Sequence, residues 1–178
     1  PALVGLHDHS YYTTSRRAVQ MSYTGPRLYL AAGVTTIRTT GSQYPYAEIN
    51  LKKAIEAGEV PGPRMFVTGP YLTGDQGSMN MAKLSDPEHA RRVVRYWAEE
   101  GVDWFKAYTW ISRDELAAAI DEAHKHGIKV TAHLCSVSFR EAVEAGIDNI
   151  EHGFFTNSDY VEGKQPGVCP PGVRQSLL

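Results

Sequence analysis

Residues 1–9, with the sequence PALVGLHDH, end a short apolar run on two histidines. The run at residues 2–6 has the length and composition of a β-strand. Because side chains two positions apart on an extended segment point the same way, His7 and His9 can both reach a single metal ion. The pair is weak evidence by itself, since two partly buried polar side chains would show the same spacing.

Strand-like and helical segments alternate along the rest of the chain. Apolar residues at i, i+3, i+4 and i+7 indicate amphipathic helices, and Ser-x-x-Glu capping boxes predict helix starts at Ser85, Ser112 and Ser138. Helical runs end at glycines suited to left-handed C-terminal caps, at positions 33, 58, 101, 127 and 146. The predicted strands are residues 2–6, 34–39, 65–68, 104–108, 129–132 and 149–151.

This alternation predicts an α/β fold with parallel strands, either an open doubly wound sheet or a barrel. No G-x-G-x-x-G segment follows a strand, which weakens the dinucleotide-binding form of the open sheet. In a parallel barrel, the carboxyl ends of all strands open onto one face. We therefore expect one site to form from the metal-binding residue types at four predicted strand ends, which are His7, His9, Lys106, His133 and His152.

The motifs around these residues resemble the amidohydrolase superfamily, and within it the imidazolonepropionase-like and prolidase-like members. The segments that carry the resemblance span nearly the whole chain: 1–9 (PALVGLHDH), 32–38 (AGVTTIR), 57–64 (AGEVPGPR), 101–106 (GVDWFK), 122–127 (EAHKHG), 130–133 (VTAH) and 145–153 (AGIDNIEHG). The resemblance implies a TIM (β/α)₈ barrel of amidohydrolase type, of which residues 1–153 form about six β/α units. Residues 154–178 are expected to form an irregular Gly/Pro-rich tail or loop.

The resemblance also implies a role for each site residue. His7 and His9 would bind one divalent metal ion, His133 and His152 a second, and Lys106 would bridge both ions as its carbamate. A free lysine is a cation with a reference pKa of about 10.4, whereas a desolvated neutral amine can capture carbon dioxide and become an anionic ligand. Zinc is the expected metal, as one or two ions. Hydroxide held between two ions would attack an amide carbonyl, so we expect Lys106 and His152 to be catalytic.

Other residues are assigned on position alone. Tyr108, Arg38 and Tyr71 are candidates for holding a small-molecule substrate. Residues 70–84 follow the third strand on the face of the metal site, and form either a substrate-contacting loop or lid, or an ordinary exposed loop. The remaining histidines fall on predicted helices and are interpreted as structural, namely His89, His124 and His126.

The chain departs from the superfamily after its sixth strand. The superfamily's barrel has eight strands, and an Asp at the end of the eighth moves a proton from the hydroxide to the leaving nitrogen. Strands seven and eight are missing here, and neither Asp8 nor Glu151 matches that acid. The first and sixth strands are therefore expected to have unpaired edges, which the missing barrel half would cover, supplied by the same protein or by an oligomer partner.

These features favour a metal-dependent hydrolase of amide or peptide (non-ester C–N) bonds in small molecules, such as a dipeptidase or a cyclic-amide hydrolase. A mononuclear deaminase of the same superfamily is an alternative, which Lys106 disfavours because that class uses no carbamate. An inactive metal-binding fragment or scaffold is a third interpretation, because the strand-eight Asp is missing.

Composition excludes several classes of partner. The 178 residues are 42% hydrophobic and 21% charged, with a formal net charge of −2, so no basic stripe for nucleic acid is expected. No segment approaches the roughly 20 apolar residues of a membrane span. Cys135 and Cys169 lack CxxC spacing, so neither a disulfide framework nor a thiolate zinc site is expected, and Cys135 is interpreted as a small buried residue. The chain opens on Pro1 without an initiator Met, so the cellular location stays open, with the cytoplasm as the default.

Overall fold

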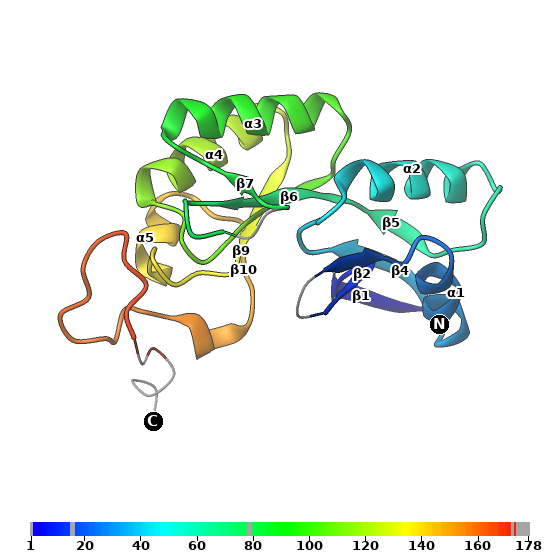
Figure 1. Ribbon diagram of the computed structural model, residues 1–178, viewed down its shortest axis with the longest axis horizontal. Coiled ribbons are helices and arrows are strands. Elements are labelled where there is room, and N and C mark those ends of the chain that lie inside the picture. The colour runs from blue at the N-terminus through cyan, green and yellow to red at the C-terminus, as the bar shows by residue number, and fades with distance from the viewer. Residues whose placement is uncertain (1, 15–16, 78–79, 172, 174–178) are drawn as a thin grey trace.

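The computed structural model describes residues 2–14, 17–77, 80–171 and 173, and has an α/β fold (Figure 1). The described strands form one sheet in the order β1-β4-β5, a second in the order β10-β9-β8-β6-β7, and a two-stranded hairpin, β2-β3. All ladders in the two larger sheets are parallel. The strands are β1 (Leu3–Asp8), β2 (Tyr11–Thr13), β3 (Ala18–Gln20), β4 (Val34–Thr39), β5 (Arg64–Phe66), β6 (Thr68–Thr73), β7 (Ala82–Lys83), β8 (Trp104–Ala107), β9 (Lys129–Ala132) and β10 (Asn149–Ile150). The helices are α1 (Thr24–Ala31), α2 (Pro45–Glu56), α3 (Pro87–Glu99), α4 (Arg113–Lys125), α5 (Phe139–Glu144) and the 3₁₀ turn η1 (Gly153–Thr156).

The third predicted strand is the one that differs most from its prediction. Residues 65–68 are divided between β5 and β6, which part at Val67. Val67 donates its N–H to the Asp103 carboxylate at 2.7 Å and accepts from the Asp103 N–H at 2.7 Å, so neighbouring groups replace its ladder bonds. β5 then pairs with β4, and β6 pairs with β8.

Residues 70–84 are not the simple loop or lid that was predicted. β6 continues through Thr73 with every residue buried, and β7 pairs with it in parallel. Buried backbone must satisfy its polar groups, and the ladder does so here. Ser78 and Met79, from the middle of the predicted loop, lie outside the described residues.

Helix ends follow the predicted signals with one exception. The five predicted cap glycines all have positive φ, between 68° and 93°. Ser112 and Ser138 form the predicted capping boxes with Glu115 and Glu141. The box predicted at Ser85 is wrong, because Asp86 caps α3 by accepting from the His89 N–H at 2.7 Å.

The core lies between the second sheet and the helices that cover one side of it, as Figure 1 shows for α3 and α4. Phe105 and Leu72 from the strands meet Val94, Leu116 and Ile120 from the helices, all at most 2% exposed. Burying each such side chain contributes about 1.5–3 kcal/mol. This packing fixes β6, β8 and β9, whose carboxyl ends carry the site described below.

The first and last parallel strands have open edges, as predicted. Among the described strands, β1 pairs only with β4, and β10 pairs only with β9. Leu3, Val4 and Leu6 of β1 are 57–66% exposed. A hollow of about 310 Å³ beside β1, β4, β5 and β8 is lined mostly by apolar side chains, including Val4, Leu6, Ile37, Phe66 and Trp104.

The prediction that the two cysteines form no disulfide is wrong. Cys135 and Cys169 are bonded, with Cα atoms 4.9 Å apart across a sequence separation of 34. The spacing of the two cysteines in the sequence did not predict this bond, because the segment after β10 folds back onto the loop that follows β9. Ser158 donates to the Cys135 carbonyl at 2.8 Å and Lys164 donates to the Ser136 carbonyl at 3.0 Å, so the disulfide is one of three tethers.

No helix within the described ranges combines the length and the apolar character that crossing a bilayer requires.

Glu48 is a fully buried carboxylic acid in the first turn of α2. Burial raises its pKa to about 8, although the side chains of Thr39, Ser42 and Gln20 act in the opposite direction. Because the folded protein holds this proton to higher pH than the unfolded chain does, the free energy of unfolding falls as pH rises from the usual pKa of 4.5 to about 8.

We predict that Glu48→Gln removes this pH dependence. Between pH 5 and pH 7.5, the wild-type protein should lose up to about 1.4 kcal/mol of unfolding free energy per pH unit more than the variant does. Urea denaturation at a series of pH values measures the difference. Glu56→Gln, at an exposed position on the same helix, is the matched control and should follow the wild type. Parallel profiles for Glu48→Gln and the wild type would contradict the prediction.

Candidate functional site

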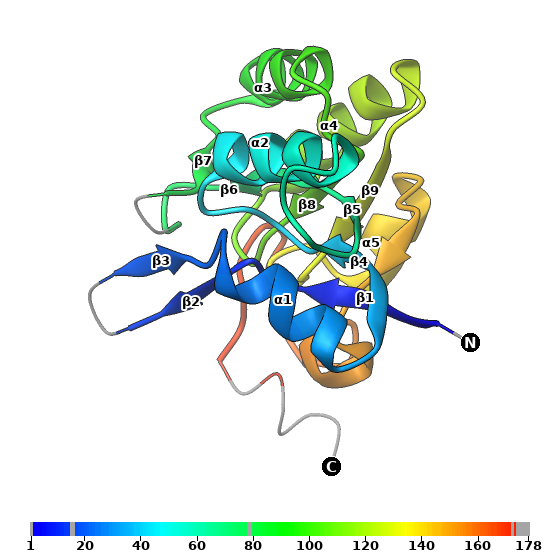
Figure 2. The same ribbon diagram turned by 90° about the vertical axis from the view of Figure 1, so that its right-hand side faces the viewer.

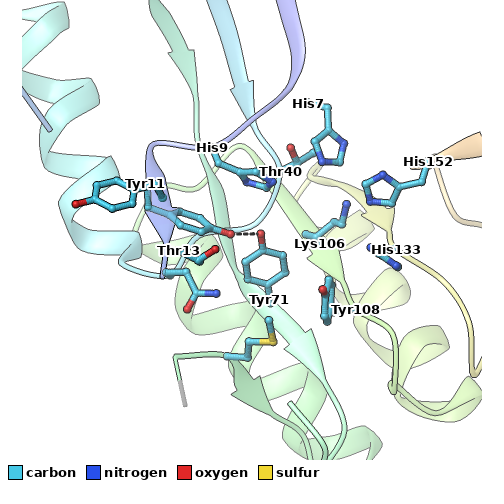
Figure 3. Close-up of a pocket in the computed structure, with 13 residues that line it drawn as sticks. His7, His9, Tyr11, Thr13, Thr40, Tyr71, Lys106, Tyr108, His133 and His152 are labelled. Carbon is cyan, nitrogen blue, oxygen red and sulfur yellow. Dashed lines mark hydrogen bonds between the residues drawn. The ribbon is translucent and has the colours of Figure 1, made fainter. Parts of the chain in front are cut away.

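One pocket of about 490 Å³ collects the five predicted metal-binding residues (Figure 3). They come from four strands: His7 from β1 with His9 just beyond it, Lys106 from β8, and His133 and His152 from the segments that directly follow β9 and β10. The other lining residues are Tyr11, Tyr12, Thr13, Thr40, Gln43, Tyr71, Met81 and Tyr108.

The four imidazole rings form a continuous series of contacts. The ring centroids of His7 and His9 are 5.3 Å apart, those of His7 and His152 4.7 Å, and those of His133 and His152 4.4 Å. His7 and His9 therefore share one pocket, as their two-residue spacing predicts. The first and sixth parallel strands meet at this point through their side chains, although their backbones do not pair.

Lys106 is buried at the base of the pocket, with 1% of its surface exposed. Lys106 on β8 lies opposite Tyr71 on β6 and Thr131 on β9 in the sheet. Desolvation by burial lowers the pKa of Lys106 to about 7, and the charge on Arg38 adds to this effect while Glu151 opposes it. A substantial fraction of the amine is therefore neutral near pH 7, and a neutral amine is nucleophilic.

Two of the four histidines, His9 and His152, favour the neutral form. Burial, followed by the charges on His7 and Lys106, lowers the pKa of His9 to about 4. Burial also lowers the pKa of His152, with Lys106 as the next cause. Neutral imidazoles keep a lone pair, which a metal ligand needs. The buried Nδ1 of His9 has no hydrogen-bond partner within the described part of the chain.

His152 has a left-handed backbone conformation, with φ of 70°. It is the only described residue other than glycine with positive φ. Such conformations cost free energy in residues with a Cβ and concentrate at functional sites. Here the turn aims the imidazole of His152 toward His7 and His133, as Figure 3 shows.

Glu151 positions the imidazole of His7 through a hydrogen bond. Its carboxylate, on a residue 7% exposed, accepts from His7 Nδ1 at 2.7 Å, from Arg38 at 2.6 Å and from Thr131 at 2.6 Å. Burial raises its pKa, but the hydrogen bonds from Thr131 and His7 and the charges on Lys106 and Arg38 outweigh that effect, so the net pKa is lowered. Because an ionised carboxylate only accepts, His7 Nδ1 carries a proton and its Nε2 keeps the lone pair.

The substrate candidates divide into two groups. Tyr71 and Tyr108 line the pocket. Arg38 does not line it, because its guanidinium is held by Glu151, donates to the Leu6 carbonyl at 2.9 Å and lies over the Trp104 ring.

The three helical histidines lie outside the pocket, as predicted. His124 contacts Asp148 at 2.9 Å, and His89 contacts the Ser85 hydroxyl at 3.1 Å. His126 Nε2 is 3.7 Å from Glu122. None of these contacts involves a residue that lines the pocket.

Sequence reasoning missed Tyr11 and the β2-β3 hairpin that carries it. Tyr11 pairs with Gln20 in the hairpin and its hydroxyl contacts that of Tyr71 (Figure 2 shows the hairpin, Figure 3 the contact). The two-residue spacing of His7, His9 and Tyr11 was visible in the sequence, but Ser10 lies in a bend between β1 and β2, so no single strand alternation runs through Tyr11.

The donor set suits a divalent metal, although the side chains are not closed around one. In the described part of the chain, no three His, Cys, Asp or Glu side chains are near enough to one another to hold an ion. Four imidazoles nonetheless converge, three of them in a series of ring contacts under 5 Å apart, and the buried Nδ1 of His9 has no partner. Imidazole nitrogens with an anionic oxygen are a suitable ligand set for zinc.

Comparison with protein families matches residues 1–173 to the family described as "Amidohydrolase family". The chain belongs to this family, as the sequence motifs predict. Its members are usually metal-dependent hydrolases.

Individual relatives agree with this assignment. An uncharacterized protein of Mycobacterium tuberculosis is 36% identical over 92 residues, which cover 44% of this chain and 25% of that protein. Among solved structures, a protein from Bifidobacterium longum that is provisionally classed as a prolidase is 31% identical, with a TM-score of 0.71 over 86% of this chain and 40% of that one. A Xaa-Pro dipeptidase crystallised with bound methionine is 20% identical, with a TM-score of 0.69 over 89% and 49%, and shares the fold. The chain thus spans less than half the length of these relatives.

We predict that Glu151→Ala lowers the free energy of unfolding by about 3 kcal/mol, because it leaves the Arg38 guanidinium buried without its partner. Urea denaturation at pH 7 measures the loss. The matched control is Glu144→Ala, whose ion pair with Arg113 is more than half exposed on both sides and should contribute less than about 1 kcal/mol. Equal losses in the two variants would show that the Glu151 network does not hold the strands together.

Proposed function

We propose that this chain forms the metal-binding part of a hydrolase that cleaves amide or peptide C–N bonds in small molecules. The observation that carries the proposal is the convergence of four imidazoles and one desolvated lysine, from four parallel strands, on a single pocket. Dipeptides and cyclic amides fit the proposal, since a pocket of about 490 Å³ accommodates a molecule of that size.

We propose a separate role for each of these residues. His7, His9, His133 and His152 would hold one or two divalent ions, zinc by preference. Such ions lower the pKa of bound water and polarise a carbonyl group. Lys106 would add carbon dioxide at its neutral amine, form a new N–C bond and release one proton, and so gain an anionic oxygen beside the imidazoles. Glu151 would keep His7 in the tautomer whose Nε2 faces the pocket.

The fold that we propose for the whole domain is a (β/α)₈ barrel. The parallel strands occupy six successive positions, with β5 and β6 sharing the third. Two further strands, from the rest of the protein or from an oligomer partner, would cover the open edge of β1 and the apolar hollow beside Val4 and Trp104. The small share of its relatives that the chain covers supports this proposal.

Two other functions are alternatives to the hydrolase. A mononuclear deaminase would need no carbamate, and the desolvation of Lys106 disfavours it. An inactive scaffold is consistent with the lining of the pocket, in which none of the described residues is Asp or Glu. The acid that moves a proton to the leaving nitrogen would then have to come from outside this chain.

We predict that the chain binds divalent zinc and that His152→Asn weakens the binding at least about tenfold, because even removing a residue that only orients a ligand costs that much. Metal content after dialysis, measured by plasma mass spectrometry, gives the stoichiometry and the affinity. The matched control is His89→Asn, which should bind zinc as the wild type does. Equal zinc binding by both variants, or no zinc binding by the wild type, would overturn the metal assignment.

The same samples separate the alternatives. Two ions per chain, together with a carbamate carbon resonance from ¹³C-labelled bicarbonate that Lys106→Met abolishes, would support the hydrolase. One ion and no such resonance would favour the deaminase. A loaded protein that cleaves no dipeptide or cyclic amide would favour the scaffold.

A further inference from the structure

Four histidines and three tyrosines that line the pocket contact one another in a closed circle, and Tyr12 lines the pocket outside this circle. The ring of His9 lies 5.1 Å from that of Tyr11, whose hydroxyl contacts the hydroxyl of Tyr71. The rings of Tyr71 and Tyr108 are 5.1 Å apart, and Tyr108 lies 4.9 Å from His133. The histidine contacts described above complete the circle. We call Tyr11, Tyr71 and Tyr108 the tyrosine wall.

The circle has two chemically distinct halves, with Lys106 between them (Figure 3). The histidine half presents nitrogen lone pairs. The tyrosine half comes from three separate elements: the hairpin strand β2, strand β6 and the segment just after β8. A substrate whose scissile carbonyl lies at the histidines therefore has its neighbouring group against the tyrosines.

The tyrosine wall presents ring surface without charge. The hydroxyls of Tyr11 and Tyr71 share a hydrogen bond, and Tyr71 is only 4% exposed. A phenol has a reference pKa of about 10, so these side chains carry no charge at physiological pH. Met81 adds a further apolar side chain to the lining.

The tyrosine half of the lining has no counter-charge for an ionic side chain. Among the described residues that line the pocket, none is Asp, Glu or Arg, and Lys106 lies between the two halves. A cation could still contact the faces of the tyrosine rings. Such a cation would lie near the proposed metal ions, with no carboxylate among the described lining residues to offset the repulsion.

We propose that the tyrosine wall is a specificity pocket for a neutral apolar or aromatic side chain next to the scissile amide. The proposal rests on the proposed function, because the histidine half defines where the amide lies. Aromatic rings favour edge-to-face and offset contacts with one another, and Tyr71 and Tyr108 already make such a contact, with their ring planes at 72°. Phenylalanine is therefore the side chain that we expect to bind best.

The test compares four uncharged-backbone probes that differ only in the side chain: the N-acetyl amides of phenylalanine, lysine, aspartate and glycine. Equilibrium binding to the full chain is measured by ligand-observed NMR, with zinc and again after chelation. The phenylalanine probe should bind at least about tenfold more tightly than the other three. Equal binding of all four, or preferred binding of the lysine or aspartate probe, would overturn the proposal.

Variants locate the selectivity. Tyr108→Ala and Tyr71→Ala should each reduce affinity for the phenylalanine probe about tenfold while leaving the glycine probe unchanged, and Tyr71→Phe should keep most of the affinity because it keeps the ring. Tyr108 is only partly buried, so its variant stays informative if Tyr71→Ala does not fold, as judged by circular dichroism. Tyr160→Ala, at a position 64% exposed and outside the pocket, is the control and should bind like the wild type. An unchanged preference for phenylalanine in Tyr108→Ala would contradict the assignment.

The two proposals fail in different ways. Loss of metal binding with a retained preference for the phenylalanine probe would reject the proposed hydrolase and keep the tyrosine wall. Normal zinc binding without that preference would reject the specificity pocket and keep the metal centre.

Discussion

The buried carboxylate of Glu151 is the contact on which the arrangement of the site depends. The backbones of β1 and β10 do not pair in the described structure, so side chains must join the two ends of the series of parallel strands. Glu151 does this by accepting from His7 on β1, Arg38 on β4 and Thr131 on β9. The same carboxylate therefore sets the geometry of the strands and the tautomer of a proposed metal ligand, which links the stability of the fold to the chemistry of the pocket.

Burial governs the electrostatics on the pocket side of that carboxylate. Desolvation lowers the pKa of Lys106 and of His9, and it raises the pKa of Tyr11 and Tyr71. All four groups are driven toward their neutral forms, which are the forms that a metal ligand, a carbon dioxide acceptor and an apolar wall require. The pocket thus combines imidazole and phenol rings without an acidic side chain among its described lining residues.

Much of the fold could be predicted from local signals. Strands β4 and β9 have the predicted bounds, and the helices around Ala90 and Leu116 lie where their apolar stripes indicate. The errors arose where distant groups compete with local ones. Asp103 breaks the third strand at Val67, and the Cys135–Cys169 bond joins segments that only the folded chain brings together. The convergence of His7, His9, Lys106, His133 and His152 on one pocket could be predicted because these residues fall at strand ends in the family's order, whereas Tyr11 was missed because a three-residue hairpin strand has no periodicity to detect.

We propose that the imidazoles of His7, His9, His133 and His152 surround a divalent metal ion at the carboxyl ends of the parallel strands. This proposal can be tested with a crystal structure of the zinc-loaded protein, with anomalous scattering recorded on both sides of the zinc absorption edge. We expect zinc density inside the pocket, with nitrogens of these histidines at about 2.0–2.1 Å from an ion. Zinc density elsewhere on the chain, with the four rings still arranged as they are here, would contradict it.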